Sequence, residues 1–201
     1  MIKEKDYPQI MPNQLKGFNG DTFVCEEFLK LKEQFNIKRI TETGTALAGT
    51  TKWFCENFDE VHTIEINQTY YDIAKDRCKE FENLTMHLGS SEDLIQEAIL
   101  SNNLRFSAFF LDAHWGGHCP LEQELTKIGE LCTDPIIAIH DFKVPDDEAM
   151  GFDSINGQPF TYEWLKPYFD KIYPNGYDHY YNSDQKSTEI KRGVIYLTPK
   201  I

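Results

Sequence analysis

The feature that most constrains the fold is an alternation of short apolar runs with amphipathic stretches between residues 21 and 142. The runs have the length and the β-branched and aromatic content of buried strands, while the stretches between them repeat apolar residues every three or four positions, as helices do. Strands that alternate with helices form parallel sheets covered on both faces. The alternation therefore predicts a doubly wound α/β domain with a mostly parallel sheet.

The pattern also places the individual elements along the chain. We expect strands at 37–43, 61–66, 84–88, 106–113 and 135–142, and helices at 21–36, 51–58, 70–81, 90–100 and 121–132. Beyond residue 142 the pattern loosens into a loop at 144–160, a helix at 162–169 and strands at 177–181 and 192–199, with an antiparallel strand at the C-terminal end. No repeat or linker interrupts residues 1–201, so we expect one domain, with 1–20 as an N-terminal arm and 144–160 as a lid or substrate loop.

Charge and cysteine content narrow the function classes. Because nucleic-acid surfaces depend on Lys and Arg, a formal net charge of -13 predicts a small-molecule substrate and no nucleic-acid partner. The five cysteines include no C-x-x-C pair, which disfavours structural zinc. No apolar run approaches the roughly 20 residues of a membrane-spanning helix, and the N-terminus lacks the apolar core of a secretory signal. We therefore expect a cytoplasmic protein without a membrane partner; the oligomeric state stays open.

The turn after the first expected strand carries the strongest functional signal. It has the sequence ETGTALAGTT at residues 42–51, and an acid, Glu65, ends the next strand about twenty residues later. In doubly wound sheets, ligands bind at the carboxyl ends of the strands, where glycines admit a ligand and a helix N-terminus offers free N–H groups. Glu65 is placed to accept hydrogen bonds from the hydroxyls of a ribose. The alternatives are a plain strand-to-helix turn and a solvated strand-end charge.

The order of residues in this turn separates two kinds of nucleotide. A dinucleotide site requires G-x-G-x-x-G, whereas residues 44–49 read GTALAG. The turn instead resembles motif I of class I S-adenosylmethionine-dependent methyltransferases. The shared pattern is an acid, any one residue and a glycine, followed by small residues and then Gly-Thr. The resemblance covers about residues 24–142, including LGSSEDL after the third strand and FFLDAHW at the fourth. Within that class the turn is similar to the macrocin O-methyltransferase type, with Ala48 replacing a glycine and Thr50 a serine.

The resemblance implies a fold, a cofactor and an activity. It implies a Rossmann-like methyltransferase domain that binds S-adenosylmethionine and methylates an oxygen of a small molecule or sugar. Ser90 and Ser91 follow the third strand, where such enzymes contact the adenine, although helix capping is an alternative role for them. The residues implied in cofactor binding are Glu42, Gly44, Thr45, Gly49, Thr50, Thr51, Glu65, Ser90, Ser91 and Asp112.

Candidate catalytic residues follow the fourth and fifth strands. Methyl transfer requires alignment of the acceptor and removal of its proton. Asp112, His114 and His140 are the candidates, because an imidazole acts as a base near neutral pH. In the resembling family, an aspartate after strand four and an Asp-Asp pair after strand five hold a divalent metal. Here Asp112 and Asp141 match, but His140 replaces one carboxylate, so both Mg²⁺ assistance and metal-free histidine catalysis stay open.

Two other functions remain compatible with the sequence. The first is an NAD-linked oxidoreductase on the same fold, which the missing G-x-G-x-x-G disfavours. The second is a protein that holds a nucleotide without turnover. Burial of the strand-end acids in structural pairs would favour this second function.

Overall fold

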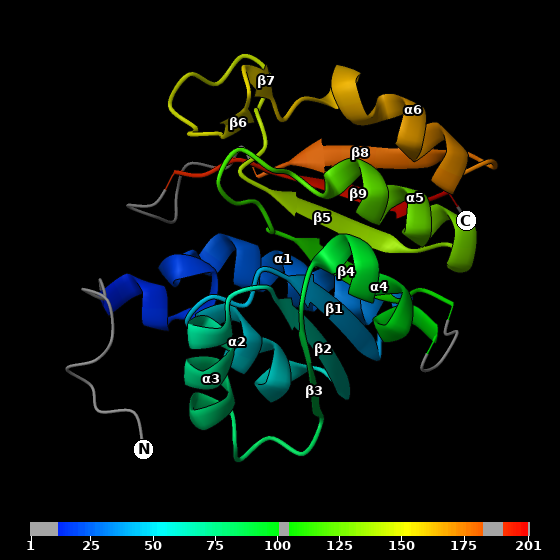
Figure 1. The fold of residues 1–201 in the computed structure, drawn as a ribbon. Coiled ribbons are helices and arrows are strands. Elements are labelled where there is room, and N and C mark those ends of the chain that lie inside the picture. The colour runs from blue at the N-terminus through cyan, green and yellow to red at the C-terminus, as the bar shows by residue number, and fades with distance from the viewer. Residues whose placement is uncertain (1–11, 101–104, 183–190, 201) are drawn as a thin grey trace.

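The computed structural model describes residues 12–100, 105–182 and 191–200, which form a seven-stranded sheet with helices on both faces (Figure 1). Across the sheet the strands are β3 (Leu84–Leu88), β2 (Glu60–Glu65), β1 (Arg39–Thr43), β4 (Ala108–Leu111), β5 (Ile136–His140), β9 (Val194–Pro199) and β8 (Tyr177–Tyr181). Strands β1 to β5 are parallel, and β9 runs antiparallel to both of its neighbours. The predicted doubly wound fold with an antiparallel C-terminal strand is confirmed.

The central strands β4 and β5 supply the two cores in alternation. In β4, Phe109 and Leu111 join the core beneath α4 (Ser91–Leu100), α5 (Leu121–Leu131) and α6 (Tyr162–Ile172). Ala108 and Phe110 of the same strand join the core beneath α1 (Thr22–Phe35) and α2 (Gly49–Asn57). Helix α3 (Gln68–Arg77) packs Ala74 against the turn before α2. Because successive side chains of a strand point to opposite faces, such apolar runs need cover on both sides.

The strand order fixes where a ligand can bind. From β1 the chain builds outwards through β2 to β3 and then crosses back to β4 on the other side of β1. The connections that leave β1 and β4 therefore diverge, which opens a crevice at the carboxyl ends of these strands. Gly44 N–H donates to Ile64 O at 3.0 Å and Asp112 N–H donates to Thr43 O at 3.1 Å, so the two exits lie side by side.

The helix expected at 70–81 ends four residues early, as α3, and two segments differ from the expected pattern in kind. The loop predicted at 144–160 contains a small hairpin of β6 (Ser154–Ile155) and β7 (Gln158–Pro159), turned by Asn156-Gly157 with both φ angles positive. Asn-Gly is a hairpin signal, but strands of two residues carry no periodicity that a sequence could display. Of the predicted arm, residues 1–11 lie outside the described residues, and the rest forms the turns η2 (Pro12–Leu15) and η3 (Gly17–Gly20).

No helix within the described residues is both long and apolar enough to cross a bilayer.

A pair of histidines in the sheet, one buried and one half-buried, leads to a prediction about stability. His62 of β2 and His87 of β3 lie side by side, with His62 Nδ1 3.1 Å from His87 Nε2. Burial lowers the pKa of both rings below the usual 6.5. Their contribution to the free energy of unfolding is therefore present above pH 6.5 and lost as the pH falls below it. Between about pH 7.5 and about pH 5.5, the urea midpoint should fall further in the wild type than in a His62→Gln/His87→Gln variant. Equal falls would contradict this account.

Candidate functional site

A cleft of about 490 Å³ opens at the carboxyl ends of β1, β2 and β4. This volume suits a small molecule or cofactor. The structure brings five of the predicted site residues into its wall, from four different connections: Gly44, Glu65, Ser91, Asp112 and His114. The crevice expected from strand order is thus lined by the residues that the sequence singled out.

At Gly44 the cleft wall is in close contact with the backbone that leaves β4. The φ of this glycine is +86°, a conformation that side chains disfavour, and a Cβ there would lie 2.8 Å from the backbone oxygen of Asp112. Glycine is therefore required at this position for two reasons: the positive φ angle, and the close approach of the chain that leaves β4.

Glu65 is held in place by two backbone N–H groups. Its Oε2 accepts from Ala46 N–H of the glycine turn and its Oε1 from Asn67 N–H, both at 2.8 Å. Burial raises the pKa of Glu65, and these two hydrogen bonds oppose the shift. Each carboxylate oxygen has a second lone pair. The carboxylate is therefore fixed in the cleft wall with acceptor capacity left for a ligand.

Three predicted cofactor residues lie beneath the glycine turn instead of in the cleft wall. Glu42 Oε2 accepts from Thr51 Oγ1 at 2.5 Å and from Thr63 Oγ1 at 2.7 Å. Thr45 Oγ1 lies 2.6 Å from Thr63 Oγ1 and completes the network. Burial raises the pKa of Glu42 to about 8. In this structure, the acid before the turn stabilises the turn from below.

Gly49 and Thr50 face the N-terminal arm. A Cβ on Gly49 would lie 2.5 Å from Lys16 O, and Thr50 Oγ1 accepts from Phe18 N–H at 2.9 Å. Because Gly49 has no side chain, the N-terminal arm can pack directly against it. A direct contact of either residue with a cofactor stays a prediction.

Both serines at the start of α4 have a buried hydroxyl, and neither Ser90 Oγ nor Ser91 Oγ has a hydrogen-bond partner among the described residues. Ser91 lines the cleft and lies next to Glu124, a fully buried carboxyl on α5 whose pKa burial raises to about 7. Sequence analysis missed Glu124, because an acid within an amphipathic helix is usually exposed.

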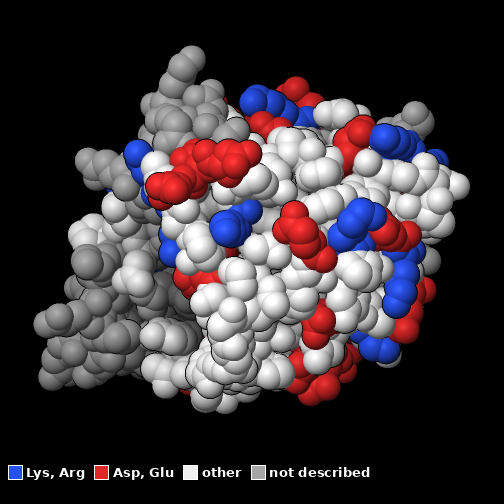
Figure 2. Space-filling view, turned by 90° about the horizontal axis from the view of Figure 1, so that it is seen from above, with Lys and Arg blue, Asp and Glu red and all other residues white. Residues whose placement is uncertain are grey.

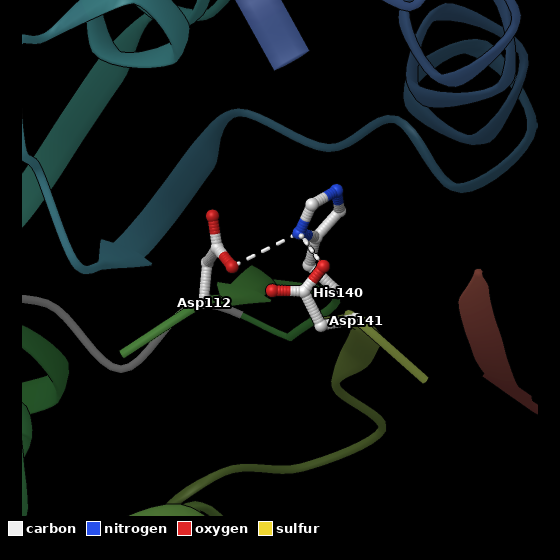
Figure 3. A group of neighbouring side chains, drawn as sticks. All are labelled: Asp112, His140 and Asp141. Atoms are coloured by element: carbon white, nitrogen blue, oxygen red, sulfur yellow. Dashed lines mark hydrogen bonds and ion pairs between the residues drawn. The ribbon is translucent and has the colours of Figure 1, made fainter. Parts of the chain in front are cut away.

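His140 joins the acids that follow β4 and β5 (Figure 3). Its Nδ1 lies 3.0 Å from Asp112 Oδ1 and 3.1 Å from Asp141 Oδ1. Burial alone would lower the pKa of His140, but the two carboxylates raise it well above its usual value. Asp141 has φ +58°, a conformation uncommon outside glycine that clusters at functional sites. His140 is buried and bridges the two acids.

His114 lies in the cleft wall and contacts a second pair of acids. Its Nε2 is 3.2 Å from Asp141 Oδ2 and 3.2 Å from Asp153 Oδ2. The hydrogen bond to Asp141 raises the pKa of His114, and burial opposes the rise. Because a carboxylate only accepts hydrogen bonds, Nε2 carries the proton and Nδ1 of the neutral ring has the free lone pair. A carboxylate that orients a histidine in this way is a common arrangement for a general base.

Sequence analysis missed Asp153 and Arg192, which complete this cluster. Arg192 Nε donates to Asp141 Oδ1 at 2.5 Å, and its Nη2 donates to Asp153 Oδ1. A signal was available for Arg192. It precedes β9, and an antiparallel neighbour of β5 begins where β5 ends, so its first residues reach the site.

Similarity to known proteins rests on structure. No protein-family model and no curated protein sequence matches the chain. An O-methyltransferase from Bacillus cereus in complex with S-adenosylhomocysteine (SAH) is 16% identical, with a TM-score of 0.58 over 98% of this chain and 86% of that one. The O-methyltransferase TomG from Streptomyces achromogenes, in complex with S-adenosylmethionine, is 15% identical, with a TM-score of 0.60 over 98% and 85%. An rRNA methylase from Streptococcus thermophilus is 11% identical, with a TM-score of 0.58 over 88% and 96%.

At these identities the comparison establishes the fold. The sheet and its helices are those of Rossmann-like methyltransferases, which include O-methyltransferases and an rRNA methylase.

Proposed function

We propose that the chain is an S-adenosylmethionine-dependent methyltransferase that methylates an oxygen of a small molecule or sugar, as enzymes of the macrocin O-methyltransferase type do. The observation that carries the proposal is Glu65, whose carboxylate is fixed beside the glycine turn in the same cleft as His114. The O-methyltransferases of the same fold, in complexes with SAH and S-adenosylmethionine, support this cofactor. We further propose that residues 1–201 act as one methyltransferase-like domain in the cytoplasm.

In this proposal, different residues of the cleft contact different parts of the cofactor. Glu65 accepts hydrogen bonds from the ribose hydroxyls, and Gly44 lets the chains that leave β1 and β4 lie close together in the cleft wall. Ser91 contributes a hydroxyl towards the adenine. Glu42, Thr45 and Thr51 hold the turn in shape from below. The bound cofactor supplies an activated methyl group, so the protein has to orient the acceptor and accept its proton.

His114 is the base in the proposed mechanism. The cofactor would supply the methyl group and leave as SAH when the methyl–sulfur bond breaks, while the acceptor hydroxyl would give its proton to Nδ1 of His114 and Asp141 would stabilise the imidazolium. His140 is buried and keeps Asp112 and Asp141 in place. Its role is therefore to position these acids, whereas His114 contacts the acceptor.

A small acceptor is supported by the distribution of charge. On the face that Figure 2 presents, Lys and Arg are interspersed with Asp and Glu and form no continuous basic field. The formal net charge is -13, whereas binding to a phosphate backbone depends on clustered basic side chains. Although an rRNA methylase has the same fold, we therefore propose a small-molecule substrate.

One observation favours the rival function of nucleotide binding without turnover. Asp112 and Asp141 are engaged in pairs with His140 and Arg192, which is how structural acids behave. Nucleotide binding without turnover would not require His114 and its acid partners in the cleft wall. Turnover on a panel of hydroxylated acceptors separates the two functions.

Calorimetric titration with SAH and with NAD tests the cofactor directly. We expect SAH to bind at one site and NAD not to bind. Binding of NAD in place of SAH would establish the oxidoreductase alternative, and binding of neither would remove the basis of the proposal.

Glu65 should account for much of the cofactor affinity. A hydrogen bond to a charged group is worth about 1.5 to 3 kcal/mol, so Glu65→Gln should weaken SAH binding by roughly tenfold or more. Calorimetry measures the change, with Glu82→Gln as a matched control because Glu82 is an exposed carboxylate on the loop before β3. An unchanged SAH affinity in Glu65→Gln would mean that this carboxylate only braces the turn.

A further inference from the structure

We infer that Arg192 is the resident counter-cation of the acid cluster formed by Asp112, Asp141 and Asp153, and that it takes the place in which a divalent metal ion would otherwise bind. Its role in catalysis rests on the proposed methyltransferase function, whereas its role in excluding a metal is independent of turnover.

The acid cluster has two sets of converging donors. One set is Asp112, His140 and Asp141, and the other is His114, Asp141 and Asp153; within each, the ligand atoms lie within 4.8 Å of one another. Distance alone would therefore admit a metal ion at either set. Both sets depend on Asp141, so the surroundings of this carboxylate decide whether an ion fits.

Both oxygens of Asp141 already face nitrogen atoms. Oδ1 accepts from Arg192 Nε at 2.5 Å and lies 3.1 Å from His140 Nδ1, while Oδ2 lies 3.2 Å from His114 Nε2. Asp153 is engaged in the same way, by Arg192 Nη2 at Oδ1 and by His114 Nε2 at Oδ2. A guanidinium that bridges two carboxylates forms charge-assisted hydrogen bonds in its preferred fork geometry.

A hard divalent ion does not fit this arrangement. Magnesium and calcium take about six to eight oxygen ligands, whereas the cluster offers imidazoles and carboxylates that are already hydrogen-bonded. The guanidinium stays protonated at every physiological pH, so an ion at Asp141 would lie beside another positive charge. The ion could bind only after Arg192 had left.

The backbone holds Arg192 at this place. Gly151 N–H donates to Lys191 O at 2.7 Å, Gly193 N–H donates to Gly151 O at 2.8 Å, and Phe142 N–H donates to Gly193 O at 2.9 Å. A Cβ on Gly193 would lie 1.9 Å from Phe142 O, so the chain passes the end of β5 as closely as a glycine allows. Arg192 is therefore placed beside Asp141 by main-chain contacts on both of its sides, unlike a mobile surface arginine.

This arrangement assigns Arg192 a positioning role in methyl transfer. It offsets part of the negative charge of Asp141 and Asp153 while leaving one oxygen of each to hold His114, the proposed base. It also fastens the segment at 144–160, through Asp153, over the strand ends. Methyl transfer then needs no divalent cation.

Titration with Mn²⁺, followed by electron paramagnetic resonance, tests the inference on the intact chain. The wild type should leave Mn²⁺ free, and Arg192→Met should gain one bound ion with an affinity roughly tenfold or more above any in the wild type. Arg192→Gln, which keeps hydrogen-bond donors without the charge, should gain the same site. Arg105→Met is the matched control, because Arg105 forms an exposed pair with Asp134 at the opposite end of β4 and β5, and it should behave as the wild type does.

Two outcomes would overturn the inference. The first is one tightly bound Mn²⁺ in the wild type that is lost in Asp141→Asn. The second is no gain of Mn²⁺ binding in either Arg192 variant, with circular dichroism confirming that at least one of them is folded. SAH titration of the same samples keeps the two proposals apart, since failure of SAH to bind would count against the methyltransferase function and leave the metal result intact.

Discussion

Replacing His114 by alanine is expected to lower kcat for methyl transfer by about 10²- to 10⁴-fold, the range that a positioned general base contributes. The expectation follows from the geometry of the cleft, where Nε2 of His114 faces Asp141 and Asp153 and the ring lines the wall. The loss should appear in kcat, while the affinity for SAH should stay close to that of the wild type. Steady-state kinetics and calorimetry on the same sample measure both quantities.

His118 provides the matched control for this substitution. It lies only four residues away, but it pairs with Glu92 at 2.9 Å and its side chain is 44% exposed. His118→Ala should therefore retain most of the activity. Equal activity of His114→Ala and the wild type would exclude His114 as the base.

The pH dependence of the rate gives a second test of His114. Because the base must be neutral, the rate should rise with pH. The hydrogen bond to Asp141 raises the pKa of His114 above the usual 6.5, so the midpoint of this rise should lie above 6.5. In His114→Ala, the residual rate should lose this rise. A midpoint below 6.5 in the wild type would contradict the assignment.

The strands and helices of the sheet could be predicted because each is marked locally. The strand at 84–88 was expected with the bounds of β3, since an asparagine and a glycine flank a short run of five residues that begins and ends with leucine. The hairpin of β6 and β7 was not predicted, because its two-residue strands are held by contacts of the backbone and not by a repeating pattern.

The candidate site was predictable where it depends on strand order and not where it depends on side-chain pairing. Gly44 and Glu65 could be placed in the cleft because parallel strands bring their carboxyl ends to one edge. Glu42 shares that edge, yet its side chain points below the turn, towards Thr51 and Thr63. Arg192 reaches Asp141 from a position just before β9, about fifty residues further along the chain. Such pairings are set by packing, which no local pattern encodes.

Gly44→Ala is expected to abolish measurable SAH binding, because two separate penalties act at this position. The first is backbone strain, since φ is +86°, and a non-glycine residue there costs about 1 to 3 kcal/mol. The second is a clash, since the new Cβ would lie 2.8 Å from the backbone oxygen of Asp112 and cannot be relieved by moving a side chain. Relief requires the exits of β1 and β4 to separate, and the cleft lies between them.

Gly157→Ala separates the two penalties. Gly157 has nearly the same angle, +83°, at the tip of the β6–β7 hairpin, and a Cβ there would have nothing within 4 Å. This control should lose stability by about 1 to 3 kcal/mol through strain alone and bind SAH as the wild type does. Gly44→Ala should lose both stability and SAH affinity, measured by urea unfolding and calorimetry. If Gly44→Ala lost only as much stability as Gly157→Ala and still bound SAH, the glycine would serve the turn alone, and the cofactor would have to bind elsewhere.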